Sequence, residues 1–241
     1  MAIQLDICKL GRLPYDDAWD AQKELVEARK HNPDLRDQLL LLEHPPTYTL
    51  GRRGSLDNLL LTEQQIDQLG FCLRWVDRGG DITYHGPGQL VGYPILNLKR
   101  WFGERGKTRA DLHAYLRDLE EVIIQTLAQL GIHGWRFPGY TGVWVDRPNG
   151  AEKIAAIGIK VSPRGVSSHG FALNVNPEMT HFGHIIPCGI DDHGVTSLTA
   201  VLGRQITIDE VMPILIEQFL QIFQHTPQYS TSLETRNLSS E

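Results

Sequence analysis

The pattern of apolar positions at the start of the chain changes period twice, from that of a strand to that of a helix and back. Residues 3–11 (IQLDICKLG) are typical of a strand. Residues 15–30 repeat apolar side chains at helical spacing and predict a helix. The apolar run within residues 38–51 (QLLLLEHPPTYTLG) predicts a buried strand that ends in a proline turn. The apolar side of the helix predicted over residues 15–30 carries Ala18, Leu25 and Val26.

Three further helices are predicted from capping residues and helical spacing. The two capping boxes are Thr62 with Gln65 and Thr207 with Glu210. We expect the first of these helices to end at Gly70 and the second near Phe223. Between them, Thr108 can cap a long helix that Gly131 ends. The apolar side chains of the long helix recur at Leu112, Tyr115, Leu116, Leu119, Ile123 and Leu127.

Two apolar runs in the middle of the chain flank a segment rich in glycine. Residues 71–77 (FCLRWVD) and 89–98 (QLVGYPILNL) predict strands, and residues 78–90 (RGGDITYHGPGQL) hold four glycines. Each glycine costs backbone entropy on folding, so a plain turn rarely needs four. The segment is therefore either a long hairpin loop or a loop whose free N–H groups hold an oxygen-bearing ligand, with Tyr84 and His85 pointing inward.

The second half of the chain favours an antiparallel sheet. Residues 141–177 contain three apolar runs separated by the turn sequences PNG and SPRG, which predict a meander. Long helices beside such strands predict an α+β fold with a mixed, largely antiparallel sheet packed with helices. We expect one domain over residues 1–225 and a polar, disordered tail over residues 226–241.

Composition narrows the class of protein. The 241 residues are 41% hydrophobic and 22% charged, which is typical of an ordinary globular domain. No basic N-terminal segment precedes an apolar run and no stretch reaches the ~18 apolar residues of a membrane helix, so we expect a cytoplasmic protein without a membrane partner. Three scattered cysteines agree with a reducing compartment. A net charge of -6 argues against nucleic-acid binding.

The sequence gives little support for a phosphate loop, a hydrolase serine or a zinc site. The sequence Gly106–Thr108 (GKT) resembles the end of a phosphate loop, but Trp101 stands where the first glycine would be. The chain has no G-x-S-x-G element for a hydrolase serine. A zinc site could be built from His181, His184, Cys188 and His193. Because their spacing fits no common ligand pattern, we expect no metal, no cofactor, and histidines that line or brace the loop around the cysteine.

Cys188 is the candidate nucleophile. In IIPCGI, Pro187 fixes the approach of the chain and Gly189 leaves the sulfur open, whereas Cys8 and Cys72 lie within strand patterns and are expected to be inert core residues. A loop cysteine needs a partner that lowers its pKa, such as a lysine, a histidine or a helix N-terminus.

These motifs together resemble a known family. RGGDITYHGPGQLVGYPILNL, KIAAIGIKV, HGFALNVNP and IIPCGIDDHGVTSL follow one another as in the lipoyl(octanoyl) transferases of lipoate biosynthesis. The likeness starts at LGRLPYDDAWDAQ and LLLLEHPPTYTLGRRG and reaches about residue 220. It implies the catalytic-domain fold of biotin and lipoate protein ligases.

The resemblance also implies a reaction. An octanoyl group passes from octanoyl-acyl carrier protein through a cysteine thioester, matched here by Cys188, to the target lysine of a lipoyl domain. The implied acceptors are 2-oxoacid dehydrogenase subunits and the glycine cleavage H protein. Lys153 matches the lysine that lowers the pKa of the cysteine. The implied substrate contacts are Arg78, Gly79, Gly80, Asp81, Ile82, Thr83, Tyr84, His85, Ala156, Ile157, Gly158, Gly170, Phe171 and Ala172.

Two other functions stay open at this point. An ATP-dependent lipoate or biotin ligase would share the fold, although the lack of a nucleotide loop and the PCG setting of Cys188 argue against it. A non-enzymatic binder of acyl-carrier or lipoyl domains would leave Cys188 unactivated.

Strand register predicts which lysine can face Cys188. If the SPRG turn sets the register, the facing pairs are Val161 with Val166, Ile157 with Gly170, and Lys153 with Asn174. Side chains alternate along a strand, so Lys153 and Lys160, seven positions apart, should point to opposite sides of the sheet. We expect Lys153 to face the pocket and Lys160 to face solvent.

Overall fold

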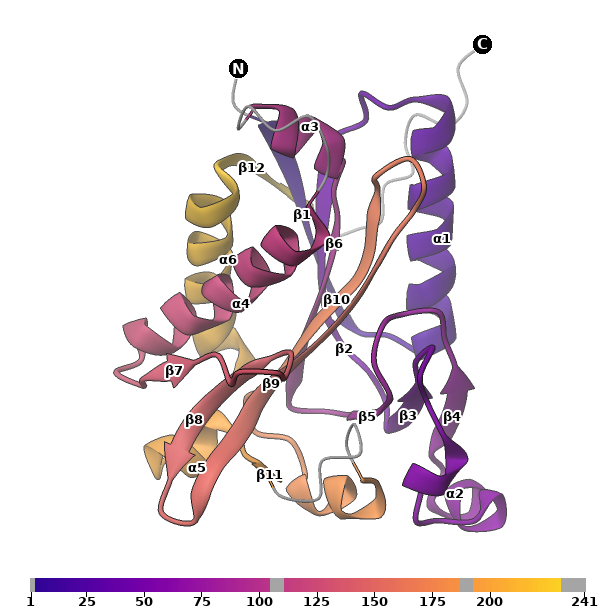
Figure 1. Cartoon of the computed structure of the whole chain (residues 1–241), viewed down its shortest axis with the longest axis vertical. Coiled ribbons are helices and arrows are strands. Elements are labelled where there is room, and N and C mark those ends of the chain that lie inside the picture. Colours follow the sequence, from indigo (N-terminus) through magenta and orange to yellow (C-terminus); the bar gives the residue numbers. More distant parts are fainter. Residues whose placement is uncertain (1–2, 105–110, 187–192, 231–241) are drawn as a thin grey trace.

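A mixed sheet, with nine strands in the part of the chain that the structure describes, forms the centre of the protein (Figure 1). The structure is a computed structural model that describes residues 3–104, 111–186 and 193–230. Within these residues the strands follow the order β12-β1-β2-β6-β10-β9-β8-β7, and β11 pairs with β9. The pairings β1 with β2, β1 with β12 and β9 with β11 are parallel, and the others are antiparallel. The bounds are β1 (Ile3–Arg12), β2 (Asp37–Glu43), β6 (Gln89–Ile95), β7 (Gly134–Trp135), β8 (Val143–Arg147), β9 (Gly150–Val161), β10 (Ser167–Asn174), β11 (Gly194–Val195) and β12 (His225–Ser230).

A second sheet, with three strands among the described residues, lies beside the first. In it β3 (Thr47–Leu50) pairs with β4 (Cys72–Trp75) and with β5 (Ile82–His85). The predicted buried strand that ends in a proline turn is β2, and this turn leads the chain into β3, a strand of the other sheet that the sequence pattern did not separate. The glycine-rich segment is also no simple hairpin loop, since it contains β5 and joins β4 to a strand of the larger sheet.

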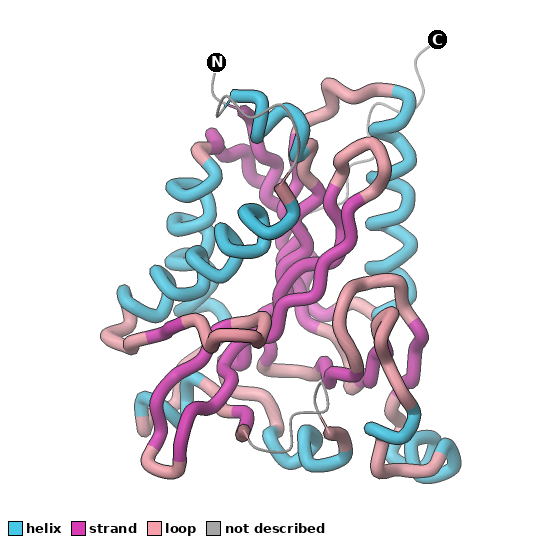
Figure 2. Tube along the Cα trace, viewed as in Figure 1, coloured by secondary structure: helices cyan, strands magenta, loops and turns pink. Residues whose placement is uncertain are grey.

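Helices cover both faces of the larger sheet (Figure 2). The helix α1 (Tyr15–His31) packs against β6 and β10 on one face, whereas α4 (Leu112–Gln129) and α6 (Ile208–Phe223) pack together on the other. This arrangement confirms the predicted α+β class. Among the described residues, no helix is long and apolar enough to cross a membrane. The shorter elements are α2 (Glu63–Leu69), α3 (Leu98–Glu104), α5 (Leu198–Leu202), and the 3₁₀ helices η1 (Leu56–Asn58) and η2 (Met179–His184).

Local capping signals set most helix ends. Both predicted capping boxes are confirmed, and Gly70 ends α2 in the left-handed conformation. The predicted start of the long helix is wrong. Asp111 caps α4 by accepting a hydrogen bond from the backbone N–H of Ala114, and Thr108 lies outside the described residues. Gly131 follows the helix with a φ of 76°, as expected for a terminating glycine.

The C-terminal segment corrects the predicted domain boundary. Residues 225–230 form β12, which pairs in parallel with β1 at the edge of the larger sheet. The expected disordered tail therefore does not begin at residue 226, and the rest of that tail, residues 231–241, lies outside the described residues. The polar sequence of this segment did not predict a strand, because its pairing partner, β1, lies at the other end of the chain.

The predicted register of β9 and β10 is wrong by one residue. Val161 lies opposite Ser167, and Gly158 lies opposite Gly170. The backbone N–H of Ser162 donates to the Val166 carbonyl at 2.8 Å, which closes a three-residue loop with Gly165 at a φ of 86°. A loop of this length ends in a left-handed residue and shifts the register relative to the four-residue turn assumed from SPRG.

Candidate active site

One pocket of about 610 Å³ collects nearly all of the predicted site residues from the two sheets. The contributing segments are residues 78–83, residues 156–159, residues 169–172 and Lys153. His85 also lines the pocket, and Tyr84 does not. Cys188 lies outside the described residues. Apart from Tyr84, the residues predicted to contact substrate thus share one cavity, although they come from distant parts of the chain.

Glycines allow the first segment to lie directly on β9. The backbone N–H of Gly79 donates to the Ile159 carbonyl at 3.0 Å. A Cβ on Gly158 would lie 2.9 Å from the Gly79 carbonyl oxygen, closer than side chains normally approach backbone. Gly80 has a φ of 91°, which favours glycine. These glycines therefore bring the backbone of one sheet against a strand of the other.

Two charged residues hold this segment in shape. Arg78 is 7% exposed, and its Nη2 donates to the Thr49 carbonyl at 2.7 Å. Asp81 Oδ1 accepts hydrogen bonds from the backbone N–H groups of Ile82 at 2.6 Å and Ser55 at 3.2 Å. Both residues also line the pocket. They fix the loop whether or not they contact substrate.

The Tyr84 side chain departs from the expectation that it points toward ligand. It is fully buried in the smaller sheet, where its hydroxyl lies 2.8 Å from His181 Nδ1. Burial raises the pKa of Tyr84 to about 12. The Tyr48 hydroxyl lies 2.9 Å from His184 Nδ1 in the same way. The two tyrosines therefore hold η2, the element that precedes the candidate nucleophile's segment.

Lys153 reaches the pocket because β9 contains a bulge. Val143 lies opposite Ala155 and Trp144 opposite Lys153, so one extra residue of β9 lies between these pairs. Ile154 and Ala155 both pack into the main core. The bulge reverses the alternation of side chains, which makes the expectation of opposite faces for Lys153 and Lys160 wrong.

The surroundings of the two lysines still differ. Lys153 is 9% exposed, lines the pocket, and places Nζ 4.9 Å from the centre of the Trp144 ring. Lys160 forms an ion pair with Asp77 next to the turn, with 35% of its side chain exposed. Lys153 does not lie opposite Asn174 as predicted. Its ladder partners are Trp144 and Val195.

Asp77, His169 and Lys160 form a polar cluster that the sequence did not indicate. His169 Nε2 lies 2.7 Å from Asp77 Oδ1, and Lys160 binds the other carboxylate oxygen. These contacts hold the pKa of Asp77 well below its usual range. His169 lines the pocket with a φ of 55°, a strained backbone for a residue other than glycine. The cluster joins the loop before Arg78 to the β9–β10 hairpin.

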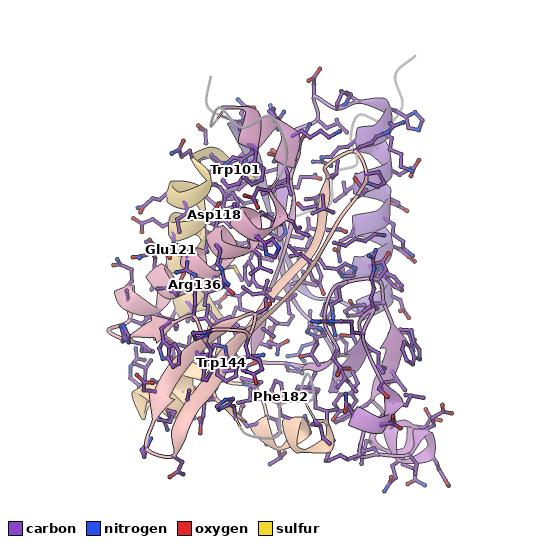
Figure 3. All side chains as sticks on the ribbon, in the orientation of Figure 1. Trp101, Asp118, Glu121, Arg136, Trp144 and Phe182 are labelled. Carbon is purple, nitrogen blue, oxygen red and sulfur yellow. The ribbon has the colours of Figure 1, made fainter. Side chains whose placement is uncertain are left out.

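A buried carboxylate anchors another wall of the pocket. Glu120 of α4 is fully buried, and it accepts hydrogen bonds at 3.1 Å from the Gly142 backbone N–H and from Arg136 Nε. Arg136 also binds Glu121, and Figure 3 shows these two side chains next to each other. Residues 139–141, just before Gly142, line the pocket. The ionic contacts of α4 thus position this turn.

The three histidines considered for zinc do not share one setting. His181 and His184 bind the tyrosines of the smaller sheet, whereas His193 packs 4.7 Å from the Phe137 ring and 5.4 Å from Trp144. The part of the chain that the structure describes contains no group of three or more histidine, cysteine or acidic side chains able to hold a metal.

The two cysteines expected to be inert differ in burial. Cys8 in β1 is 2% exposed, and burial raises its pKa to about 11. Cys72 is exposed, so the expectation that it lies in the core is wrong. It belongs to β4, which among the described residues is an edge strand with a partner on one side only.

The fold of the chain is similar to that of the catalytic domains of lipoate and biotin protein ligases. A bipartite lipoate protein ligase from Thermoplasma acidophilum matches 97% of the chain and 88% of its own, with a TM-score of 0.74 and 18% identity. Lipoate-protein ligase A bound with ATP matches with a TM-score of 0.72 and 16% identity, over 97% and 91% of the two chains. A biotin protein ligase from Aquifex aeolicus gives 0.51 at 14% identity, over 91% and 70%.

Sequence relatives narrow this class. Residues 14–220 match the model of the lipoyl protein ligase A/B catalytic domain, and the chain belongs to that family. An octanoyltransferase of Rubrobacter xylanophilus is 50% identical over 220 residues, 90% of this chain and 93% of the relative. An octanoyltransferase of Nostoc punctiforme is 49% identical over 213 residues, 88% and 86% of the two chains. The family resemblance predicted from the sequence is confirmed.

Proposed function

We propose that the chain transfers an octanoyl group from octanoyl-acyl carrier protein to the target lysine of a lipoyl domain. The relatives make it an acyltransferase of protein lipoylation. One observation carries the proposal: the predicted substrate segments and Lys153 line a single pocket in a chain whose relatives are octanoyltransferases.

The proposed chemistry has two steps. The Cys188 thiolate attacks the carbonyl carbon of the octanoyl thioester, and collapse of the intermediate releases the thiol of the carrier and leaves octanoyl-S-Cys188. The ε-amine of the acceptor lysine then attacks this thioester, forming an amide and freeing the Cys188 thiol. Exchange between thiols is nearly balanced and passage from sulfur to nitrogen is favourable, so the reaction needs no ATP.

Lys153 suits the proton transfers of both steps. As an ammonium group it would favour the Cys188 thiolate, and as an amine it would accept the proton of the attacking lysine. Lys153 is buried, and this strengthens the effect of its ammonium charge on the thiolate, because water screens the charge less there.

The pocket offers apolar wall for the acyl chain. Ile157 and Phe171 lie in the core and also line the pocket. Burial of the octanoyl chain would contribute ~5 kcal/mol at ~0.8 kcal/mol per methylene, enough to discriminate against much shorter acyl groups.

The proposed partners follow from this chemistry. The donor is octanoyl-acyl carrier protein, and the acceptors are lipoyl domains of 2-oxoacid dehydrogenase subunits and the glycine cleavage H protein. We therefore propose that the chain acts in the cytoplasm, where it would meet these reactants.

Intact mass spectrometry tests the proposal. Mixing the chain with octanoyl-acyl carrier protein should add one octanoyl group, and a lipoyl domain should then remove it. Cys188→Ala should abolish the adduct, whereas the matched variants Cys8→Ala and Cys72→Ala should keep it. Full turnover by Cys188→Ala would refute the covalent route, and a requirement for free octanoate and ATP would make the chain a ligase.

A further inference from the structure

A chain of buried hydrogen bonds connects His85 to the strand that carries Lys153. His85 Nδ1 lies 2.8 Å from Gln89 Oε1, and Gln89 Nε2 donates to Asn174 Oδ1 at 2.9 Å. Asn174 Nδ2 donates to the Thr196 carbonyl at 3.0 Å, and the Thr196 N–H donates to the Lys153 carbonyl at 3.0 Å. The linking side chains of Gln89 and Asn174 come from residues that are 1% and 3% exposed.

Backbone carbonyls set the direction of every bond in this chain. Carbonyl oxygens only accept, so the Asn174 atom that binds Thr196 is the amide nitrogen, and its Oδ1 faces Gln89. The Gln89 amide nitrogen also donates to the Tyr84 carbonyl at 3.2 Å, which leaves Gln89 Oε1 toward His85. His85 Nδ1 must therefore donate, and in the neutral ring Nε2 carries the lone pair.

The environment of His85 keeps the ring neutral. Burial is the main reason that its pKa lies well below the usual value, and the nearby His44 and Arg78 lower it further. Over residues 3–104, 111–186 and 193–230, Nε2 has no hydrogen-bond partner. Since His85 lines the pocket, Nε2 is a fixed acceptor available to a bound molecule.

We propose that His85 Nε2 accepts a hydrogen bond from an N–H group of the substrate, with Gln89 and Asn174 as positioning residues that fix the ring in the required tautomer. This inference rests on the proposed function. Two substrate nitrogens have the required chemistry: the amide nitrogen of the thiol arm that carries the octanoyl group, and the amine of the acceptor lysine. Because Asn174 also holds Thr196, the same chain links the acceptor to the Lys153 backbone.

The tautomer can be measured without any substrate. In ¹⁵N-labelled protein, the ring nitrogens of His85 should report a proton on Nδ1 and none on Nε2. Gln89→Met removes the acceptor and should give a mixture of tautomers. Gln218→Met replaces another buried glutamine, on α6 and away from the pocket, and should leave the His85 signals unchanged. A proton on Nε2 in the unaltered chain would refute the inference, even if octanoyl transfer is intact.

Kinetics of the separate steps then identify the donor. His85→Phe should slow transfer about 10- to 100-fold, and His85→Gln, whose Oε1 can replace the acceptor, should recover part of the loss. If the donor is the amide of the thiol arm that carries the octanoyl group, His85→Phe should form octanoyl-Cys188 more slowly than unaltered protein when the substrate is octanoyl-acyl carrier protein. With an octanoyl thioester that lacks this amide, the two proteins should form octanoyl-Cys188 at the same rate. If the amine is the donor, only the second step slows. Equal rates for His85→Phe and unaltered protein in both steps would overturn the inference. Absence of any adduct in unaltered protein would instead overturn the proposed function.

Discussion

Gly92 lies at a contact where one added methyl group should have a large effect. It pairs across the sheet with Phe171, a pocket residue that is 2% exposed. A Cβ on Gly92 would lie 2.1 Å from Phe171 Cζ. Ordinary contacts start at 3.4 Å, so in Gly92→Ala the ring must retreat by at least 1.3 Å, the difference between 3.4 and 2.1 Å. The ring packs into the core and also lines the pocket, so in Gly92→Ala it must displace core side chains or move into the pocket.

The expected cost follows from this displacement. Overpacking a core costs typically 1–3 kcal/mol, and the size of this displacement should put Gly92→Ala at about 3 kcal/mol. In a chain of this length, Tm should then fall by about 6–12 °C. Phe171→Leu alone should cost about 1–2 kcal/mol. In the double variant the smaller side chain leaves space for the methyl group, so the total cost should lie at least about 1 kcal/mol below the sum of the single costs.

Urea unfolding followed by circular dichroism measures all four members of this cycle. Gly103→Ala is a matched control, because a Cβ there meets nothing within 4 Å. This control should be as stable as the unaltered chain or slightly more stable, since alanine favours a helix. Single costs that add to within about 0.5 kcal/mol would refute the predicted contact between Gly92 and Phe171.

Two further predictions concern reactive side chains. Lys153→Ala should reduce octanoyl transfer by about 100-fold or more and raise the pH at which Cys188 is alkylated, with Lys160→Ala near normal; the opposite ranking would exclude Lys153 as the activating group. In Cys188→Ala protein at pH 8, iodoacetamide should label exposed Cys72 but not Cys8, because burial raises the Cys8 pKa to about 11 and leaves little reactive thiolate. Equal labelling rates, read by peptide mass, would contradict this.

Structural features that depend only on residues close together in the chain could be predicted from the sequence. The capping boxes at Thr62 and Thr207 were confirmed because each needs only a side chain and a backbone group three residues away. The β8–β9–β10 meander was confirmed for the same reason, since short turns join its strands. The segments that line the pocket were predicted from the family resemblance, which rests on long sequence motifs and not on contacts between residues.

Features that depend on distant partners needed the tertiary structure. The polar segment of β12 becomes a strand only because β1 offers it an edge. Gln89 and Asn174 are polar residues inside apolar strands, and the sequence could have singled them out as buried polar groups in need of partners, but only the sheet places them opposite each other.

The position of Lys153 shows most clearly what could not be predicted from the sequence alone. The sequence by itself determined that this lysine and Lys160 lie on one strand, and strict alternation along that strand would place the two side chains on opposite faces. The tertiary structure decided otherwise, because β9 pairs with β8 through a bulge that adds one residue and reverses the alternation before Lys153. A bulge depends on how two strands fit together, so the face on which the lysine lies is a property of the strand pair.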